Sequence, residues 1–167
     1  MAISNITEII SSDIHKVWEA VLAVDKYGTW RSDLSKTEII NEKQFIEYAK
    51  NEYATTFTVT AVKPYERWEF DMENSNMKGH WVGIFTSKGK DTEIDFTENV
   101  TPKKWFMKPF VKSYLKKQQT QFVLDLKKVL DNKFWLEETI YKRTEIYMTK
   151  QRLFGGAFFL PFFVKGL

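Results

Sequence analysis

The stretch KKWFMKPFVKSYLKKQQTQFVLDLKKVLD, residues 103–131, has the pattern of a long amphipathic helix. Its apolar residues recur at helical spacing at positions 106, 110, 111, 115, 122, 126 and 129. Pro109 interrupts the pattern, so we expect a kink or a restart near Lys108. From there to Asp131 the helix would be about 35 Å long, at about 1.5 Å per residue. Such a helix is long enough to cross the concave face of a small sheet.

Upstream of this helix the sequence predicts one shorter helix and a series of strands. Residues 3–11 have a strand pattern, and Ser12 or Asp13 then caps a helix that ends near Val24. Further strands are expected over residues 34–40, 44–49, 54–62, 65–73, 78–87 and 93–100. Because the connections are short, they favour an antiparallel meander. We therefore predict an α+β protein in which a curved antiparallel sheet wraps around the long C-terminal helix.

Four short motifs accompany this order of elements. They are DIHKVW at 13–18, YGTW at 27–30, GHWVGIF at 79–85 and TEIDFTE at 92–98. Together with the final helix they resemble the START-like, or SRPBCC, superfamily, in particular its polyketide cyclase/dehydrase-like branch. The resemblance covers residues 1–131 and implies a helix-grip (START-like/Bet v 1-like) fold that binds a small hydrophobic or amphipathic ligand between sheet and helix. It also implies an alternative, a cyclase/dehydratase-like (aromatase/cyclase) enzyme that uses the same cavity.

Composition excludes several kinds of chemistry. Hydrophobic residues make up 43% of the 167 residues, which is ample for the core of one domain, and cysteine is absent. Disulfides, thiolate nucleophiles and cysteine-bound metals are therefore excluded. The chain has only two histidines, both predicted on outer faces, and no ligand cluster or glycine-rich phosphate loop. We expect neither a metal nor a cofactor.

Charge and hydropathy patterns limit the partners. The net charge of +3 and the lack of a base-reading motif argue against nucleic acid. The N-terminus lacks a secretory signal, and the longest apolar stretch, 157–164, is too short to span a membrane, so we expect a cytoplasmic protein. Lysines at 104, 108, 112 and 116 form a ridge along the final helix. They are either a solvated outer face or a contact with an anionic membrane surface or an acidic partner.

Glu98 is the candidate for acid–base chemistry. Strand alternation places it in register with the apolar residues Ile94 and Phe96. A carboxylate there must find a partner, reach water at a cavity mouth or become protonated, because an isolated buried charge is costly. Arg31 is expected to pair with Glu98, to bind an anionic ligand, or to form only a surface ion pair.

Alternation and the resemblance together define a candidate site. Gly79 and Gly83 flank Trp81 and either relax sheet curvature or make room for a larger group. Tyr114 and Gln118 would add polar groups to an apolar wall if their face of the helix turns inward. The residues expected to contact the ligand are Trp30, Arg31, Phe57, Trp68, Phe70, Trp81, Phe85, Phe96, Glu98, Phe110, Val111, Tyr114, Gln118 and Phe122.

Residues 132–167 form a C-terminal extension to this fold. Its segment 153–163 is rich in phenylalanine and would expose a large apolar surface if it hung free. We expect it to pack against a second subunit in a homodimer or to cover the cavity mouth, unless it is a non-native segment. Binding of a small molecule is the leading interpretation, and an interaction module regulated by this tail is a third alternative.

Overall fold

The computed structural model describes residues 1–132, which form seven strands, three α-helices and two short 3-10 helices. In chain order these are β1 (Ala2–Ile10), α1 (Ile14–Leu22), η1 (Val24–Lys26), α2 (Tyr27–Trp30), β2 (Leu34–Ile39), β3 (Gln44–Ala49), β4 (Ala54–Lys63), β5 (Arg67–Glu73), β6 (Met77–Lys88), β7 (Asp91–Pro102), η2 (Trp105–Met107) and α3 (Lys108–Asp131). The predicted order of elements is confirmed.

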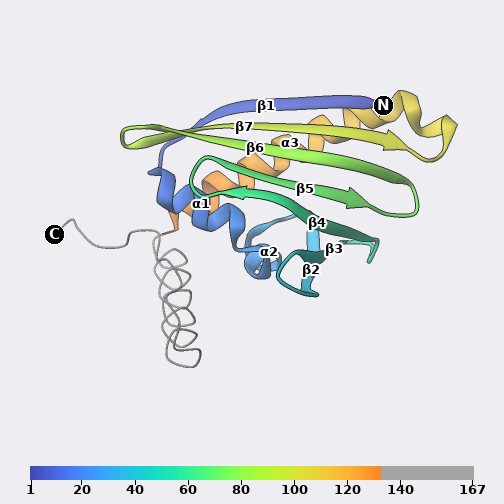
Figure 1. Cartoon of the computed structure of the whole chain (residues 1–167), viewed down its shortest axis with the longest axis horizontal. Coiled ribbons are helices and arrows are strands. Elements are labelled where there is room, and N and C mark those ends of the chain that lie inside the picture. The colour runs from blue at the N-terminus through green and yellow to red at the C-terminus, as the bar shows by residue number, and fades with distance from the viewer. Residues whose placement is uncertain (133–167) are drawn as a thin grey trace.

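All seven strands belong to one antiparallel sheet with the order β1-β7-β6-β5-β4-β3-β2. Strands β2 to β7 form the predicted meander, whereas β1 pairs with β7 at the far edge. The chain therefore passes from one edge of the sheet to the other through α1 and α2. Figure 1 shows the curved sheet lying across α3, with α1 and α2 at one end of it.

Helix α1 begins because Asp13 caps it. The Asp13 carboxylate accepts hydrogen bonds from the backbone N–H groups of His15 and Lys16, at 3.1 and 3.2 Å. The helix buries one face, including Val17 and Trp18, against the sheet. It ends at Leu22, two residues before the predicted end.

Helix α3 starts anew at Lys108 after the 3-10 turn η2, with Pro109 in its first turn. The predicted restart is confirmed, and the position suits proline because the first N–H groups of a helix have no partner within it. Val111 and Leu115 are buried, as the pattern predicts. The prediction was wrong for Phe110, which is 72% exposed. Phe110 lies about 100° around the helix from Val111 and so falls outside the buried stripe.

The core fills the space between the concave face of the sheet and the helices. On β7, Ile94, Phe96 and Val100 are buried, and on β5 the buried residues are Trp68, Phe70 and Met72. Both strands alternate buried and more exposed residues as predicted, because successive side chains of a strand point to opposite faces.

Among the helices of residues 1–132, none is long and apolar enough to cross a membrane. The expectations for the C-terminal extension, packing in a homodimer or covering the cavity, concern residues 133–167 and lie outside the described residues.

Candidate ligand-binding cavity

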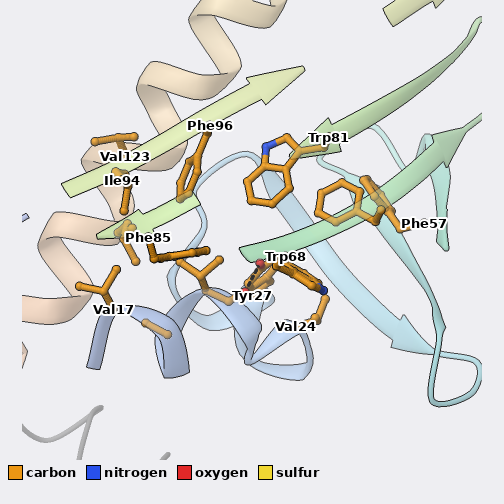
Figure 2. Close-up of a cluster of buried hydrophobic side chains, with 14 of the residues drawn as sticks. Val17, Val24, Tyr27, Phe57, Trp68, Trp81, Phe85, Ile94, Phe96 and Val123 are labelled. Atoms are coloured by element: carbon orange, nitrogen blue, oxygen red, sulfur yellow. Dashed lines mark hydrogen bonds between the residues drawn. The ribbon is translucent and has the colours of Figure 1, made fainter. Parts of the chain in front are cut away.

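A cavity of about 130 Å³ lies between the concave face of the sheet and α3. Its walls are formed by strands β2 to β7, by the segment from α2 to β2, and by one side of α3. Ten of its 22 lining residues are aromatic: Tyr27, Phe45, Tyr53, Phe57, Trp68, Phe70, Trp81, Phe96, Tyr114 and Phe122. Figure 2 shows several of these rings gathered between the strands and the helices.

The aromatic wall is ordered by stacking across neighbouring strands. The rings of Phe70 and Trp81 are parallel within 3° with centroids 4.7 Å apart, and Phe45 and Phe57 stack with centroids 4.8 Å apart. Trp68 meets Phe70 edge to face at 5.0 Å. Such pairs add to the energy of burial and restrict ring rotation. The wall is therefore a rigid apolar surface.

Gly83 makes room for the Trp81 ring. A β-carbon at position 83 would lie 2.1 Å from Cη2 of Trp81. Of the two roles predicted for this glycine, relaxing curvature or making room, the structure assigns the second. Gly79 is also crowded, though less so, since a β-carbon there would lie 2.8 Å from the backbone oxygen of Asn99.

Arg31 is the charged centre at the polar end of the cavity. Its Nε and Nη2 donate to the two carboxylate oxygens of Asp33 at 3.1 and 2.7 Å, and its Nη1 donates to Glu47 at 2.9 Å. The guanidinium also lies 5.1 Å from the ring centroids of both Tyr27 and Phe122. Burial opposes its charge, but the ion pairs with Glu47 and Asp33 raise the pKa of Arg31 above its usual value. Arg31 is thus permanently cationic.

The predicted pairing of Arg31 with Glu98 is wrong, and so is the alternative of a surface ion pair. The side chain of Arg31 is only 10% exposed, and its two carboxylate partners are Asp33 and Glu47. Asp33 lies two residues away in the same loop, where a bidentate pair forms at little cost in chain ordering. Burial raises the pKa of Glu47, although Arg31 acts against that rise.

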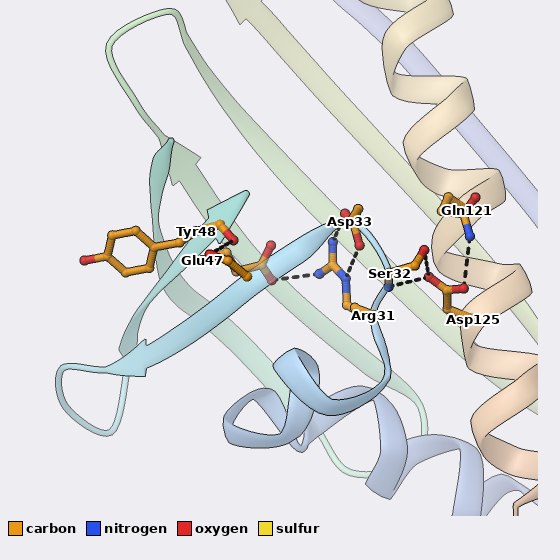
Figure 3. A network of polar contacts seen from close by, with 8 residues as sticks. Arg31, Ser32, Asp33, Glu47, Tyr48, Gln121 and Asp125 are labelled. Atoms are coloured by element: carbon orange, nitrogen blue, oxygen red, sulfur yellow. Dashed lines mark hydrogen bonds and ion pairs between the residues drawn. The ribbon is translucent and has the colours of Figure 1, made fainter. Parts of the chain in front are cut away.

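A second polar network holds the Arg31 loop against α3. The buried carboxylate of Asp125 accepts hydrogen bonds from the backbone N–H and the hydroxyl of Ser32, at 2.8 and 2.6 Å, and from the amide of Gln121 at 2.9 Å. Figure 3 shows the two networks on either side of the loop after α2, one reaching β3 and the other reaching α3. Burial opposes ionisation of Asp125, but the hydrogen bonds from Ser32 lower its pKa overall. Asp125 therefore positions Arg31 by fixing the residue next to it.

Glu98 lies in the cavity wall, opposite Trp81 of β6 and Ser4 of β1 in the strand register. Its Oε2 is buried and has no hydrogen-bond partner among residues 1–132. Burial raises the pKa of Glu98 to about 7, with Arg31 lowering it and Glu47 raising it further. Of the outcomes predicted for this carboxyl group, protonation is thus the one supported. With this pKa, the protonated and ionised forms of Glu98 coexist near neutral pH.

Helix α3 contributes the remaining polar groups. Tyr114 and Gln118 lie one turn apart and both line the cavity, so their face of the helix does turn inward. Tyr114 is 52% exposed, which places the cavity mouth at this residue. Gln119 accepts from the Ser4 hydroxyl at 2.7 Å and is held between β1 and β7.

The structure gathers most, but not all, of the predicted ligand contacts. Those that line the cavity are Arg31, Phe57, Trp68, Phe70, Trp81, Phe96, Glu98, Tyr114, Gln118 and Phe122. Trp30 stands behind the wall, with its ring 5.5 Å from that of Phe122. Phe85 and Val111 belong to the core, and Phe110 faces solvent.

Sequence reasoning missed seven polar or aromatic members of the site: Tyr27, Asp33, Phe45, Glu47, Tyr53, Thr55 and Gln119. Glu47 could have been found, because it alternates with Phe45 on β3 in the same way that Glu98 alternates with Phe96. No local pattern marks Asp33 or Tyr27. Within residues 1–132, no group of three histidine or acidic side chains is placed to hold a metal ion.

Comparison with known families identifies the chain. The family described as "Polyketide cyclase / dehydrase and lipid transport" matches residues 1–131. The protein belongs to this family. The resemblance predicted from the sequence motifs is therefore confirmed. A comparison with curated proteins gives no match.

Many solved structures share the fold of this member of the polyketide cyclase/dehydrase family. A START superfamily protein from Mycobacterium smegmatis is 12% identical, with a TM-score of 0.70 over 79% of this chain and 99% of that one. A conserved protein from Geobacillus kaustophilus is 13% identical, with a TM-score of 0.69 over 78% of this chain and 95% of that one. A protein from the dynemicin biosynthetic locus is 14% identical, with a TM-score of 0.64 over 78% of this chain and 48% of that one. The helix-grip fold is confirmed.

Proposed function

We propose that the protein binds a small amphipathic molecule in the cavity between the sheet and α3. The observation that carries this proposal is the carboxyl group of Glu98, whose buried Oε2 has no hydrogen-bond partner in the described chain, in a cavity with ten aromatic lining residues. An apolar pocket with a few convergent polar groups is the usual form of a small-molecule site. The family assignment agrees with this reading.

The cavity volume limits the ligand. Pockets for drug-sized molecules measure roughly 300–1,000 Å³, whereas an apolar cavity of about 150 Å³ holds a benzene ring. The volume of about 130 Å³ therefore supports a ligand that places one ring, or an equivalent apolar group, inside. Larger parts of a ligand would leave through the mouth at Tyr114.

The polar end of the ligand meets Glu98 rather than Arg31. Arg31 is already held by the two carboxylates of Asp33 and Glu47, so its charge is compensated. A ligand carboxylate would add a further negative charge to this cluster. A hydroxyl or amino group would instead complete the hydrogen bonding of Glu98.

A second candidate function is a cyclase/dehydratase-like reaction in the same cavity. It is favoured by the pKa of about 7 for Glu98, which suits a general acid or base at neutral pH. Tyr114, at the mouth, would orient a carbonyl group of the substrate. In this reading Glu98 moves a proton to or from the carbon chain during enolisation or dehydration.

Calorimetric titration with four matched probes tests the binding proposal: naphthalene, 2-naphthol, 2-naphthylmethylamine and 2-naphthoate. We expect the alcohol and the amine to bind more tightly than naphthalene, and naphthoate to bind most weakly. Glu98→Gln should change these preferences, whereas Glu93→Gln, on the outer face of the same strand, should leave them unchanged. Equal binding of all four probes would contradict the role of Glu98.

The same variant separates the two candidate functions. If the protein is an enzyme, Glu98→Gln abolishes turnover of a polyketide-like substrate while the substrate still binds. If the protein only binds, the variant alters affinity and no product forms with either protein. Mass spectrometry of the incubated mixture distinguishes the two results.

A further inference from the structure

The turn η2 and the start of α3 together expose an unusual concentration of aromatic side chains. Trp105 is 80% exposed, Phe106 56%, Phe110 72% and Tyr114 52%. Large apolar residues grouped within ten positions on a surface mark a site of interaction. We call residues 103–117, which contain this group, the aromatic–lysine end of α3.

The same segment carries a dense positive charge. It contains six lysines, at positions 103, 104, 108, 112, 116 and 117, and no acidic residue. Lys103 pairs with Glu73 at 2.7 Å, but the other five form no ion pair within residues 1–132. Like charges at this spacing repel one another, so an anionic partner would relieve them.

The aromatic–lysine end projects from the body of the protein. Figure 1 shows it beyond the end of β7 and beside the N-terminus, at the opposite end of α3 from Asp131. Between Lys108 and Lys117 only Val111 and Leu115 are buried. The remaining side chains of this segment surround the helix on several sides.

We propose that the aromatic–lysine end docks on an anionic membrane surface. Tryptophan and other aromatic side chains favour the boundary between headgroups and acyl chains, and lysines bind anionic headgroups. Lys108 and Phe110 are about 160° apart around the helix, so the lysine ridge and the aromatic side chains lie on different sides of this end. A fluid lipid surface can contact both sides of such an end at once, whereas a protein groove would contact only one side.

Docking through the aromatic–lysine end would bring the cavity mouth to the membrane. Phe110, Tyr114 and Gln118 follow one another at four-residue spacing on one side of α3. Tyr114 and Gln118 line the cavity, so the membrane contact continues directly into its wall. The docking surface itself does not depend on which ligand the cavity holds.

Flotation of the full chain with lipid vesicles tests the proposal. We expect binding to vesicles of phosphatidylcholine with 30 mol% phosphatidylglycerol. Each lysine near an anionic surface contributes about 1 kcal/mol, which is about fivefold in affinity. The double variant Lys104→Gln/Lys108→Gln should weaken binding about 25-fold. The control Lys43→Gln/Lys90→Gln, which removes the same charge from distant exposed turns, should change it less than about twofold.

A second measurement separates insertion of aromatic groups from simple attraction of charges. Vesicles with brominated acyl chains quench tryptophan fluorescence only where a ring enters the bilayer. We expect quenching in the natural protein and its loss in Trp105→Phe, which keeps an aromatic group and therefore still binds. Absence of binding to anionic vesicles, equal weakening by both lysine variants, or quenching that is unchanged in Trp105→Phe would each overturn the proposal.

Discussion

The indole of Trp81 lies directly over Gly83, so that a β-carbon at residue 83 would approach Cζ3 and Cη2 of the ring within 2.6 and 2.1 Å. The two residues are two positions apart on β6, so their α-carbons face the same, concave side of the sheet. The space left by the missing side chain is filled by the ring, which also stacks on Phe70. The cavity wall thus depends on a residue without a side chain.

Gly83→Ala should therefore destabilise the protein. The added methyl group must displace Trp81, and overpacking of this kind costs about 1–3 kcal/mol. Urea unfolding measures the effect. Gly28→Ala is the matched control, because a β-carbon there has its nearest contact at 3.5 Å and alanine is favoured in a helix by about 1 kcal/mol. Equal destabilisation by both variants would contradict the role of Gly83.

Glu98 should make stability depend on pH. Its pKa rises from 4.5 in the unfolded chain to about 7 in the folded one, mainly through burial. Between these values the unfolded chain releases the proton first, so the free energy of unfolding falls as pH rises. The loss amounts to about 3 kcal/mol, at about 1.4 kcal/mol per pKa unit.

Glu98→Gln removes this dependence and leaves the other titrating groups in place. The contribution of Glu98 is fully present below pH 4.5 and is lost above about pH 7. The free energy of unfolding of the variant, relative to that of the natural protein, should therefore rise by about 3 kcal/mol between pH 4.5 and pH 8. Urea unfolding of both proteins across this range measures the difference. Parallel stability profiles would show that the carboxyl group is solvated in the folded state.

Arg31 should be essential to stability because it compensates two carboxylates. Arg31→Met leaves Asp33 and Glu47 close together without a cation, and breaking a buried ion pair in this way costs about 3–5 kcal/mol. The triple variant Arg31→Met/Asp33→Asn/Glu47→Gln removes the charges together and should recover part of that loss. Thermal unfolding of the two variants compares them. A triple variant less stable than the single one would contradict this account.

Asp125 should stabilise the loop that carries Arg31. Asp125→Ala leaves the N–H of Ser32 and the amide of Gln121 without their acceptor, so we expect a loss of about 2–3 kcal/mol. Hydrogen exchange at the Ser32 amide should accelerate in the variant. Asp131→Ala, at the exposed end of the same helix, serves as the control and should change stability by less than about 0.5 kcal/mol.

Much of the site could be predicted from strand alternation. The buried register of Ile94 and Phe96 placed Glu98 inside, and the same reasoning placed Trp68 and Phe70. Alternation is a property of the extended backbone and needs no knowledge of distant contacts. The corresponding helical pattern was less useful at η2 and the start of α3. Phe106 and Phe110 follow that pattern but are exposed beyond the core.

The local pattern specifies the order of the elements, their antiparallel connections and the face of each strand that is buried. These depend on neighbouring residues, through backbone geometry, capping and short turns. The partners of Arg31, the isolation of Glu98 and the size of the cavity depend instead on the tertiary structure. They bring together residues from β3, β7, α3 and the loop after α2, and the energy of a buried charge is set by what surrounds it.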